Sequence, residues 1–269
     1  MQVILSHDVD HMTVWEHWKD PIVPKFLVRN TLELAKGLIT GREYTLRWAD
    51  LVYNKWQNIA EVMDFHDRLG IRSCFFFGLA NGKGLSYPLR FAEEWIPKVI
   101  ARGFEAGVHG IAFDDENAMR AEYEAFRRIS GQDRFGIRMH YLRQDAHTFE
   151  RMERIGYRFD ATEQGIRPPH RIGRMWEFPL QEMDGWAMDG AKRYQSRDLK
   201  GAIAHTMAKL EAAEETGLPY FNLLFHDRYY TPAFATWMAW YEAMVKELIG
   251  RGHRVVTHAE AIDQLERRT

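Results

Sequence analysis

The sequence predicts an α/β fold, a distorted (β/α) barrel of seven or eight units, and three observations lead to this prediction. Short apolar or β-branched runs alternate with longer segments of helical periodicity. The runs are short and apolar enough to indicate parallel strands buried on both faces. Polar residues suited to catalysis follow several of these runs, at the ends of the strands where β/α barrels place their active sites.

Eight segments are predicted strands and seven are predicted helices. The predicted strands are Gln2–Ser6, Ser73–Phe77, Glu105–Val108, Phe135–Arg138, Tyr157–Asp160, Arg174–Phe178, Tyr220–Phe225 and Arg254–Val256. The predicted helices are Asn58–Leu69, Phe91–Arg102, Glu116–Ile129, His147–Ile155, Asp198–Thr216, Pro232–Ile249 and His258–Arg267. Several of these helices are followed directly by glycine, such as Gly70 and Gly156, which is a common helix stop.

One segment, His11–Gln57, does not follow the alternation of strands and helices. It is rich in Trp, Tyr and Arg, and its helical part is expected at Phe26–Ile39. We interpret 11–57 as an aromatic-rich insertion after the first strand, lying over or beside the site, although such a surface could equally form a dimer interface. The irregular stretch Glu163–Arg174 is expected to be a loop near the same face.

Composition limits the classes of function. The 269 residues, 46% of them hydrophobic, suit a single domain over 1–269. The formal net charge of -2 gives no basic excess for a nucleic-acid partner or an anionic membrane surface. A single cysteine, Cys74, excludes an internal disulfide, and with no signal peptide or transmembrane segment evident it favours a cytoplasmic location.

The first candidate motif is His7-Asp8-Val9-Asp10-His11, directly after the first predicted strand. One carboxylate could bind a metal ion while the other acts as a base. An isolated Asp-x-Asp is more often a pair of turn residues. Here the position at a strand end and the flanking histidines favour the catalytic interpretation.

Three further strand ends carry polar residues. His109 follows a buried strand between glycines, where an imidazole has room to approach an ion, or to be a core histidine. Arg138 could clamp a carboxylate through two hydrogen bonds or form an ordinary ion pair. His226 ends a fully apolar strand and is a candidate general acid.

Taken in order, these motifs resemble those of the polysaccharide deacetylase family, carbohydrate esterase family four. The resemblance rests on Asp8–Asp10, Gly107–His109, Arg138–Arg143, Phe159–Thr162 and Leu223–Asp227, and extends over about residues 2 to 260. The chain is most similar to the branch with a His-Asp-Val-Asp-His first motif and an Arg-x-His-Tyr-Leu-Arg third motif. That branch is associated with the biosynthesis of surface polysaccharides and of the O-antigen of lipopolysaccharide.

The resemblance implies a role for each matching residue. Asp8 matches the catalytic base, Arg138 the arginine that holds the base, His226 the catalytic histidine and Asp160 the acid that tunes it, with Asp227 as an alternative to Asp160. The expected metal ligands are Asp10, His109 and His140. The ion is expected to be a single divalent metal, Zn²⁺ for this ligand set.

One position departs from the family pattern. Phe113 stands where the second histidine of the His-x-x-x-His metal pair is expected, and its side chain cannot bind a metal. His140, Asp114 or Asp115 would have to supply the third ligand, and His140 is preferred because a second imidazole suits Zn²⁺.

The implied activity is hydrolysis of an N-acetyl group on an amino sugar or glycan precursor, inside the cell, by a carbohydrate N-deacetylase. Two alternatives remain open: an amidohydrolase acting on a small non-sugar amide, and a degenerate barrel that binds a glycan without turnover. No phosphate-binding glycine loop or Gly-x-Ser-x-Gly elbow indicates another chemistry. The sequence leaves the particular sugar, its carrier and the oligomeric state open.

Overall fold

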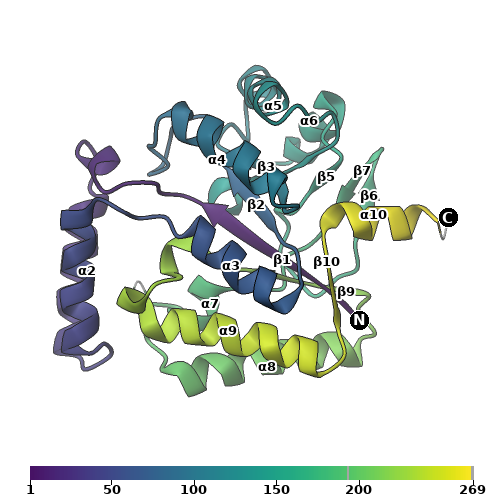
Figure 1. The fold of residues 1–269 in the computed structure, drawn as a ribbon. Coiled ribbons are helices and arrows are strands. Elements are labelled where there is room, and N and C mark those ends of the chain that lie inside the picture. The colour runs from purple at the N-terminus through teal and green to yellow at the C-terminus, as the bar shows by residue number, and fades with distance from the viewer. Residues whose placement is uncertain (193, 268–269) are drawn as a thin grey trace.

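A sheet of ten strands forms the centre of the molecule (Figure 1). The computed structural model describes residues 1–192 and 194–267. The strand order is β6-β7-β5-β4-β3-β2-β1-β9-β8, and β10 lies beside the first half of β1. Every strand pair is parallel except β6 with β7. The strands are β1 Gln2–Val9, β2 Cys74–Phe77, β3 Glu105–Gly110, β4 Gly136–Met139, β5 Phe159–Asp160, β6 His170–Ile172, β7 Met175–Glu177, β8 Glu182–Met183, β9 Tyr220–Leu224 and β10 Arg254–Val256.

A short extended segment, 175–183, joins the two ends of this strand order. Its first part is β7, which pairs with β5, and its last part is β8, which pairs with β9. Between them, Phe178 N donates to Asp160 O at 2.9 Å and Gln181 N donates to Asn222 O at 3.2 Å. The sheet therefore curls round on itself, and the predicted distorted barrel is confirmed.

Helices cover the outside of the curled sheet, as the sequence predicts. In Figure 1, α4, α5 and α6 lie on one side of β1, and α8 and α9 lie on the other. The helices of the barrel are α3 Ile59–Leu69, α4 Leu89–Ala101, α5 Glu116–Ser130, α6 Thr148–Ile155, α7 Asp184–Met188, α8 Leu199–Glu215, α9 Ala235–Gly250 and α10 His258–Glu266. Of these, α7 is not predicted from the sequence, because five residues are too few for a recognisable helical period.

Local signals explain where the helices begin and end. The side chain of Asp115 accepts hydrogen bonds from the first backbone amides of α5, and Thr257 with Glu260 forms a capping box at α10. α3 and α6 stop at Gly70 and Gly156, whose φ angles of 66° and 111° are left-handed. The predicted glycine stops at these two helices are confirmed.

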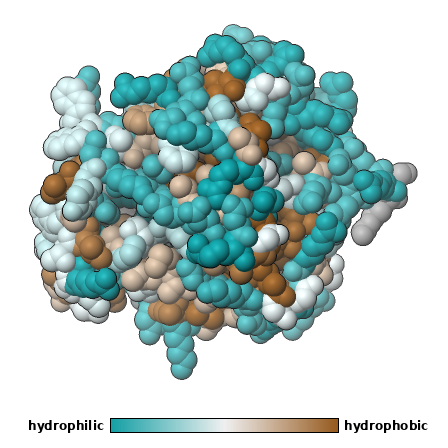
Figure 2. Space-filling view, in the orientation of Figure 1, coloured by the Kyte–Doolittle hydropathy of each residue, from teal (hydrophilic) through white to brown (hydrophobic). Residues whose placement is uncertain are grey.

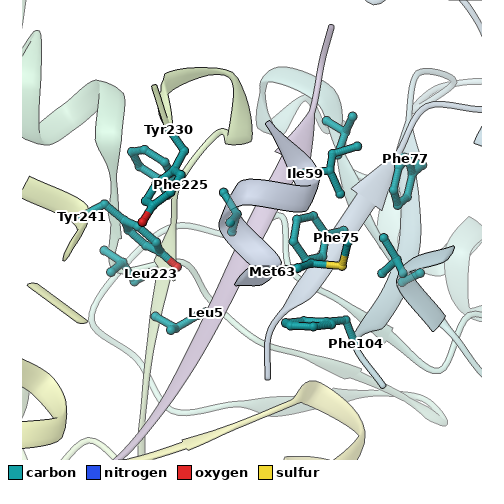
Figure 3. Close-up of a cluster of buried hydrophobic side chains, with 14 of the residues drawn as sticks. Leu5, Ile59, Met63, Phe75, Phe77, Phe104, Leu223, Phe225, Tyr230 and Tyr241 are labelled. Carbon is teal, nitrogen blue, oxygen red and sulfur yellow. The ribbon is translucent and has the colours of Figure 1, made fainter. Parts of the chain in front are cut away.

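Alternate residues of the strands pack into two separate cores. Leu5 and Phe75 belong to the large core between the sheet and its helices, which Figure 3 shows together with Tyr241 of α9. Ile4 and Phe76 belong to a smaller core inside the curled sheet. Because side chains of a strand alternate between its two faces, each strand residue is assigned to the outside or the inside of the barrel by its register.

The insertion at 11–57 contains more helix than the sequence predicts. It folds as a short 3-10 turn Trp15–His17, helix α1 Ile22–Ala35 and helix α2 Gly41–Tyr53. Figure 1 shows α2 at the left edge of the molecule, apart from the barrel helices. α1 carries Arg29 to the wall of the cavity at the C-terminal ends of the strands.

The surface is mixed in character. Figure 2 shows hydrophilic residues over most of the visible face, with hydrophobic residues in small groups between them. Within the described residues, no helix has the length and apolar content needed to cross a membrane.

Candidate active site

Three side chains of kinds that can bind a metal ion meet where β1, β3 and β4 end. Oδ1 of Asp10 lies 3.1 Å from Nε2 of His109 and 3.2 Å from Nδ1 of His140. The two ring nitrogens are 3.0 Å from each other. β3 and β4 are neighbours in register, with His109 opposite Arg138, so their ends deliver these side chains to one place.

Backbone carbonyls orient both imidazoles so that the second nitrogen of each ring faces Asp10. Nδ1 of His109 lies 3.1 Å from the carbonyl oxygen of Arg138, and Nε2 of His140 lies 3.2 Å from that of Lys83. A carbonyl can only accept, so each of these nitrogens donates its proton. The other nitrogen of each ring faces Asp10 and can bind a metal ion when the ring is neutral.

A buried carboxylate oxygen supports the same conclusion. Oδ1 of Asp10 is buried, and apart from the ring nitrogens of His109 and His140 it has no polar partner among the described residues. A charged oxygen left unpaired in the interior is unfavourable unless a cation or donor satisfies it. One carboxylate and two imidazoles, converging on this oxygen, fit a divalent ion such as Zn²⁺.

Asp8 lies beside this group and is held by an arginine. Its Oδ1 accepts a hydrogen bond of 3.0 Å from Nη1 of Arg138, and its Oδ2 lies 3.8 Å from Nε2 of His109. Burial raises the pKa of Asp8, but the charges of His109 and Arg138 outweigh burial and lower it below its usual value. Asp8 is therefore an ionised carboxylate, as a base has to be.

His226, which follows β9, faces the same group from the opposite side. Its Nε2 lies 3.6 Å from Oδ2 of Asp10, and its Nδ1 lies 3.0 Å from both carboxylate oxygens of Asp184. Oδ2 of Asp184 also accepts from the backbone N–H of His226 at 2.6 Å. Burial opposes protonation of this imidazole, yet Asp184, Asp10 and Asp8 together raise its pKa to about 10.

These groups line a cavity of about 410 Å³ at the C-terminal ends of the strands. Its walls include aromatic side chains, among them Trp186, Tyr229 and Trp237. Tyr141, also in the wall, and the next residue Leu142 have left-handed φ angles of 58° and 52°. Such backbone is unfavourable for residues other than glycine and is often found at functional sites.

The architecture of this chain is similar to that of several solved structures. A protein from Mycobacterium smegmatis assigned as a polysaccharide deacetylase superposes on this chain with a TM-score of 0.66, at 15% identity, over 99% of this chain and 90% of that one. The fold is that of the polysaccharide deacetylases. No family model and no curated protein matches the sequence.

Two other structures show how widely the polysaccharide-deacetylase fold is used. An allantoinase superposes with a TM-score of 0.59 at 11% identity, over 96% of this chain and 87% of that one. A pseudoenzyme of carbohydrate esterase family four from Bacillus anthracis gives 0.51 at 11% identity, over 96% and 64%. The reaction of this chain therefore has to be argued from its own residues.

Within this deacetylase fold, the loop after β3 does not contribute a ligand at the expected place. Asp115 is engaged as the cap of α5, where its Oδ1 accepts from Asn117 N at 2.9 Å. The backbone oxygen of Phe113 accepts from Thr148 Oγ1 at 3.0 Å, and Arg143 lies over the Phe113 ring. Of the three alternatives considered for the third ligand, the structure brings only His140 to Asp10.

The expected pairing of Asp160 with His226 is not found, and Asp184 takes that place. Asp160 is opposite Ile137, a residue of the outer core, while the preceding Phe159 packs into the inner core. By strand alternation Asp160 projects away from the cavity, where it accepts from Thr162 Oγ1 at 2.6 Å. A one-residue difference in register thus removes Asp160 from the site.

Asp227, the other expected partner of His226, is also engaged elsewhere. Its Oδ2 accepts a hydrogen bond of 2.8 Å from the backbone N–H of Asn58 at the start of α3. Sequence reasoning missed Asp184 because β8, which precedes it, is only two residues long. The signal that could have found Asp184 is its position directly after the apolar segment 175–183.

Two other groups of possible ligands are better explained as structural. In one, Nε2 of His17 lies 2.8 Å from Nδ1 of His11, and Nδ1 of His17 lies 2.8 Å from Oδ2 of Asp20. The carboxylate of Glu16 accepts hydrogen bonds from backbone amides of the same turn. Because each carboxylate of this group already has donors, it ties the insertion together. In the other, burial raises the pKa of the Cys74 thiol well above its usual value, which disfavours the thiolate that a metal requires.

Proposed function

We propose that the chain is a metal-dependent hydrolase that removes an N-acetyl group from an amino sugar, with Asp10, His109 and His140 as the metal ligands. One observation carries the proposal. Asp8, held by Arg138, and His226, held by Asp184, flank the carboxylate of Asp10, and the three acids and His226 line a single cavity.

The reaction divides between the two pairs. A divalent ion, when bound, supplies Lewis acidity to the amide carbonyl and to water. Asp8 takes the proton of the attacking water, and Arg138 keeps its carboxylate ionised and oriented. His226 gives a proton to the leaving nitrogen, because Asp184 keeps its imidazole protonated. Acetate and a free amine are the products.

The direct test is acetate release by purified protein loaded with Zn²⁺, using N-acetylglucosamine and its conjugates as substrates. We expect the wild-type protein to release acetate and the Asp8→Asn variant to lose this activity in every buffer used. Equal activity in the wild type and Asp8→Asn would contradict the proposal. Metal analysis of the purified protein shows which ion it carries.

The second candidate is an amidohydrolase acting on a small non-sugar amide, and it is supported by the allantoinase with the same fold. Offering allantoin and simple amides beside the N-acetyl sugars separates the two reactions. A third candidate, a barrel that binds a glycan without turnover, is supported by the pseudoenzyme neighbour. Absence of turnover on every substrate, with metal bound, would favour it.

We further propose that the enzyme acts in the cytoplasm, in the biosynthesis of a surface polysaccharide. The first motif, His7–His11, and the third, Arg138–Arg143, resemble the branch that works in surface-polysaccharide biosynthesis. The single cysteine, Cys74, is buried as a free thiol, which suits a cytoplasmic enzyme acting on a precursor. Fractionation of the native host, with an antibody to the chain, tests this location.

A further inference from the structure

A second cavity, of about 950 Å³, opens beside the active-site cavity and is strongly basic. The two cavities share wall residues, including Arg29, Asp189 and Arg228, so they lie next to each other. The outer cavity is lined in addition by Lys25 and Lys192. Its described wall thus has four cationic side chains and one acid.

The acid in this wall is already paired. Oδ1 of Asp189 lies 2.8 Å from Nη2 of Arg29, and Nε of the same arginine lies 2.8 Å from Glu33. The remaining positive charge of the cavity is therefore not compensated by this carboxylate.

Arg228 is the residue where this excess matters most, because it lines both cavities. Its guanidinium stacks over the Trp56 ring at 3.8 Å, which holds the planar group in place. No hydrogen bond or ion pair engages the guanidinium of Arg228 in the part of the chain that the structure describes, although its Nε is buried. Burial lowers the pKa of Arg228, and the carboxylate of Asp50 is among the groups that oppose this.

We infer that the outer cavity binds an anionic group of the substrate, and that Arg228 is the residue that recognises it. An immobilised guanidinium with an unused donor is suited to the oxygens of a phosphate or a carboxylate. The inference rests on the proposed function in placing the acetamide beside Asp10. The substrate is then an N-acetylated sugar that carries a phosphate ester or a carboxylate.

Binding, measured by calorimetry on the Zn²⁺-loaded protein, tests this inference. The probes are N-acetylglucosamine, N-acetylglucosamine 1-phosphate and 2-acetamido-2-deoxyglucuronic acid. The first is neutral, the second carries a phosphate and the third carries a carboxylate. We expect at least one anionic probe to bind about tenfold or more tightly than the neutral sugar, and its affinity to fall with added salt. Comparison of the phosphate probe with the carboxylate probe shows which anionic group the cavity binds. Equal affinity for all three probes would overturn the inference.

Variants connect the effect to Arg228. In Arg228→Met the preference for the anionic probe is expected to fall by about 10–100-fold, the usual size for a lost hydrogen bond to a charged group. Arg228→Lys, which keeps the charge, should retain part of the preference, and Arg120→Met, on the outside of α5, should retain all of it. An unchanged preference in Arg228→Met would also overturn the inference.

The stacking on Trp56 means that Arg228→Met could fail to fold, which thermal unfolding would detect. Lys25→Met with Lys192→Met then provides the second test, because both lysines lie in the wall of the outer cavity. The double variant should bind the anionic probe more weakly and the neutral sugar with unchanged affinity. Weaker binding of the neutral sugar alone would contradict the inference. If the anionic probe binds through Arg228 but no acetate is released, the proposed function fails and this inference stands.

Discussion

Asp184 holds His226 by two contacts at once: a carboxylate oxygen 3.0 Å from Nδ1 of the ring and another 2.6 Å from the backbone N–H of the same residue. The residue is thereby fixed at its backbone and at its ring. The same contact keeps the imidazole protonated with Nε2 directed at Asp10.

The first prediction concerns this pair and the pH dependence of turnover. The pKa of His226, raised to about 10, keeps the ring protonated up to alkaline pH. Asp184→Asn removes the main charge that raises it, so the alkaline limb of the kcat/KM profile should move to lower pH. At neutral pH turnover should fall by about 10²-fold, because less of the acid form remains.

Asp160→Asn is the matched control, since Asp160 projects away from the cavity. We expect the alkaline limb to keep its position in this variant, whatever its stability. A shift of the limb in Asp160→Asn but not in Asp184→Asn would restore the assignment that the sequence suggested.

The second prediction concerns the third metal ligand. His140→Ala removes one of the three proposed protein ligands, and the affinity for Zn²⁺ should fall by about 10²-fold or more. Competition with a chromophoric chelator measures this affinity. Asp115→Ala should leave it unchanged, because Asp115 caps α5, and should lower stability by about 1 kcal/mol. Loss of metal in Asp115→Ala alone would exclude the site described here.

The third prediction separates metal binding from proton transfer. Asp8→Asn should bind Zn²⁺ with nearly the affinity of the wild type, since Asp8 is not one of the three ligands. Its turnover should fall by about 10²–10⁴-fold, because an amide cannot accept the proton of water. Metal content and acetate release, measured on the same sample, give the comparison. A variant that lost its metal would show that Asp8 is a ligand.

The fourth prediction concerns stability and pH. Burial raises the pKa of Glu122 on α5 from 4.5 to about 7, although its Oε1 accepts from Ile111 N at 2.9 Å. The folded protein therefore holds this proton more tightly than the unfolded chain. The resulting contribution to stability is present below about pH 4.5 and is lost as the pH rises toward 7, by at most about 3 kcal/mol.

Glu122→Gln should remove that part of the pH dependence, because glutamine does not titrate. Urea midpoints at pH 5 and pH 7.5 measure the difference. Glu124→Gln, exposed on the same helix, is the control and should retain the wild-type dependence. An equal loss of pH dependence in both variants would show that Glu122 is not its source.

The general architecture was predictable from the sequence because its signals are local. Apolar runs gave the long strands such as β1 and β9, and glycine stops such as Gly70 gave the helix ends. Asp8, Asp10, His109, Arg138 and His226 could be grouped because parallel strands end at one edge of a sheet.

The parts that were not predictable depend on strand register and on very short elements. Whether Asp160 points inward depends on its alignment with Ile137, a relationship between strands that no local pattern encodes. Asp184 follows a strand of two residues, too short for an alternating pattern. Helix α2 was missed because polar and aromatic residues interrupt its apolar positions.

The segment 175–183 has a kinetic consequence. It is the seam of the barrel, and Asp184 comes directly after it. Until the seam has docked against β5 and β9, His226 lacks the carboxylate that holds its proton. Assembly of the proton donor should therefore be among the late events of folding, and amide exchange at Phe178 and Gln181 should slow in step with the appearance of activity during refolding.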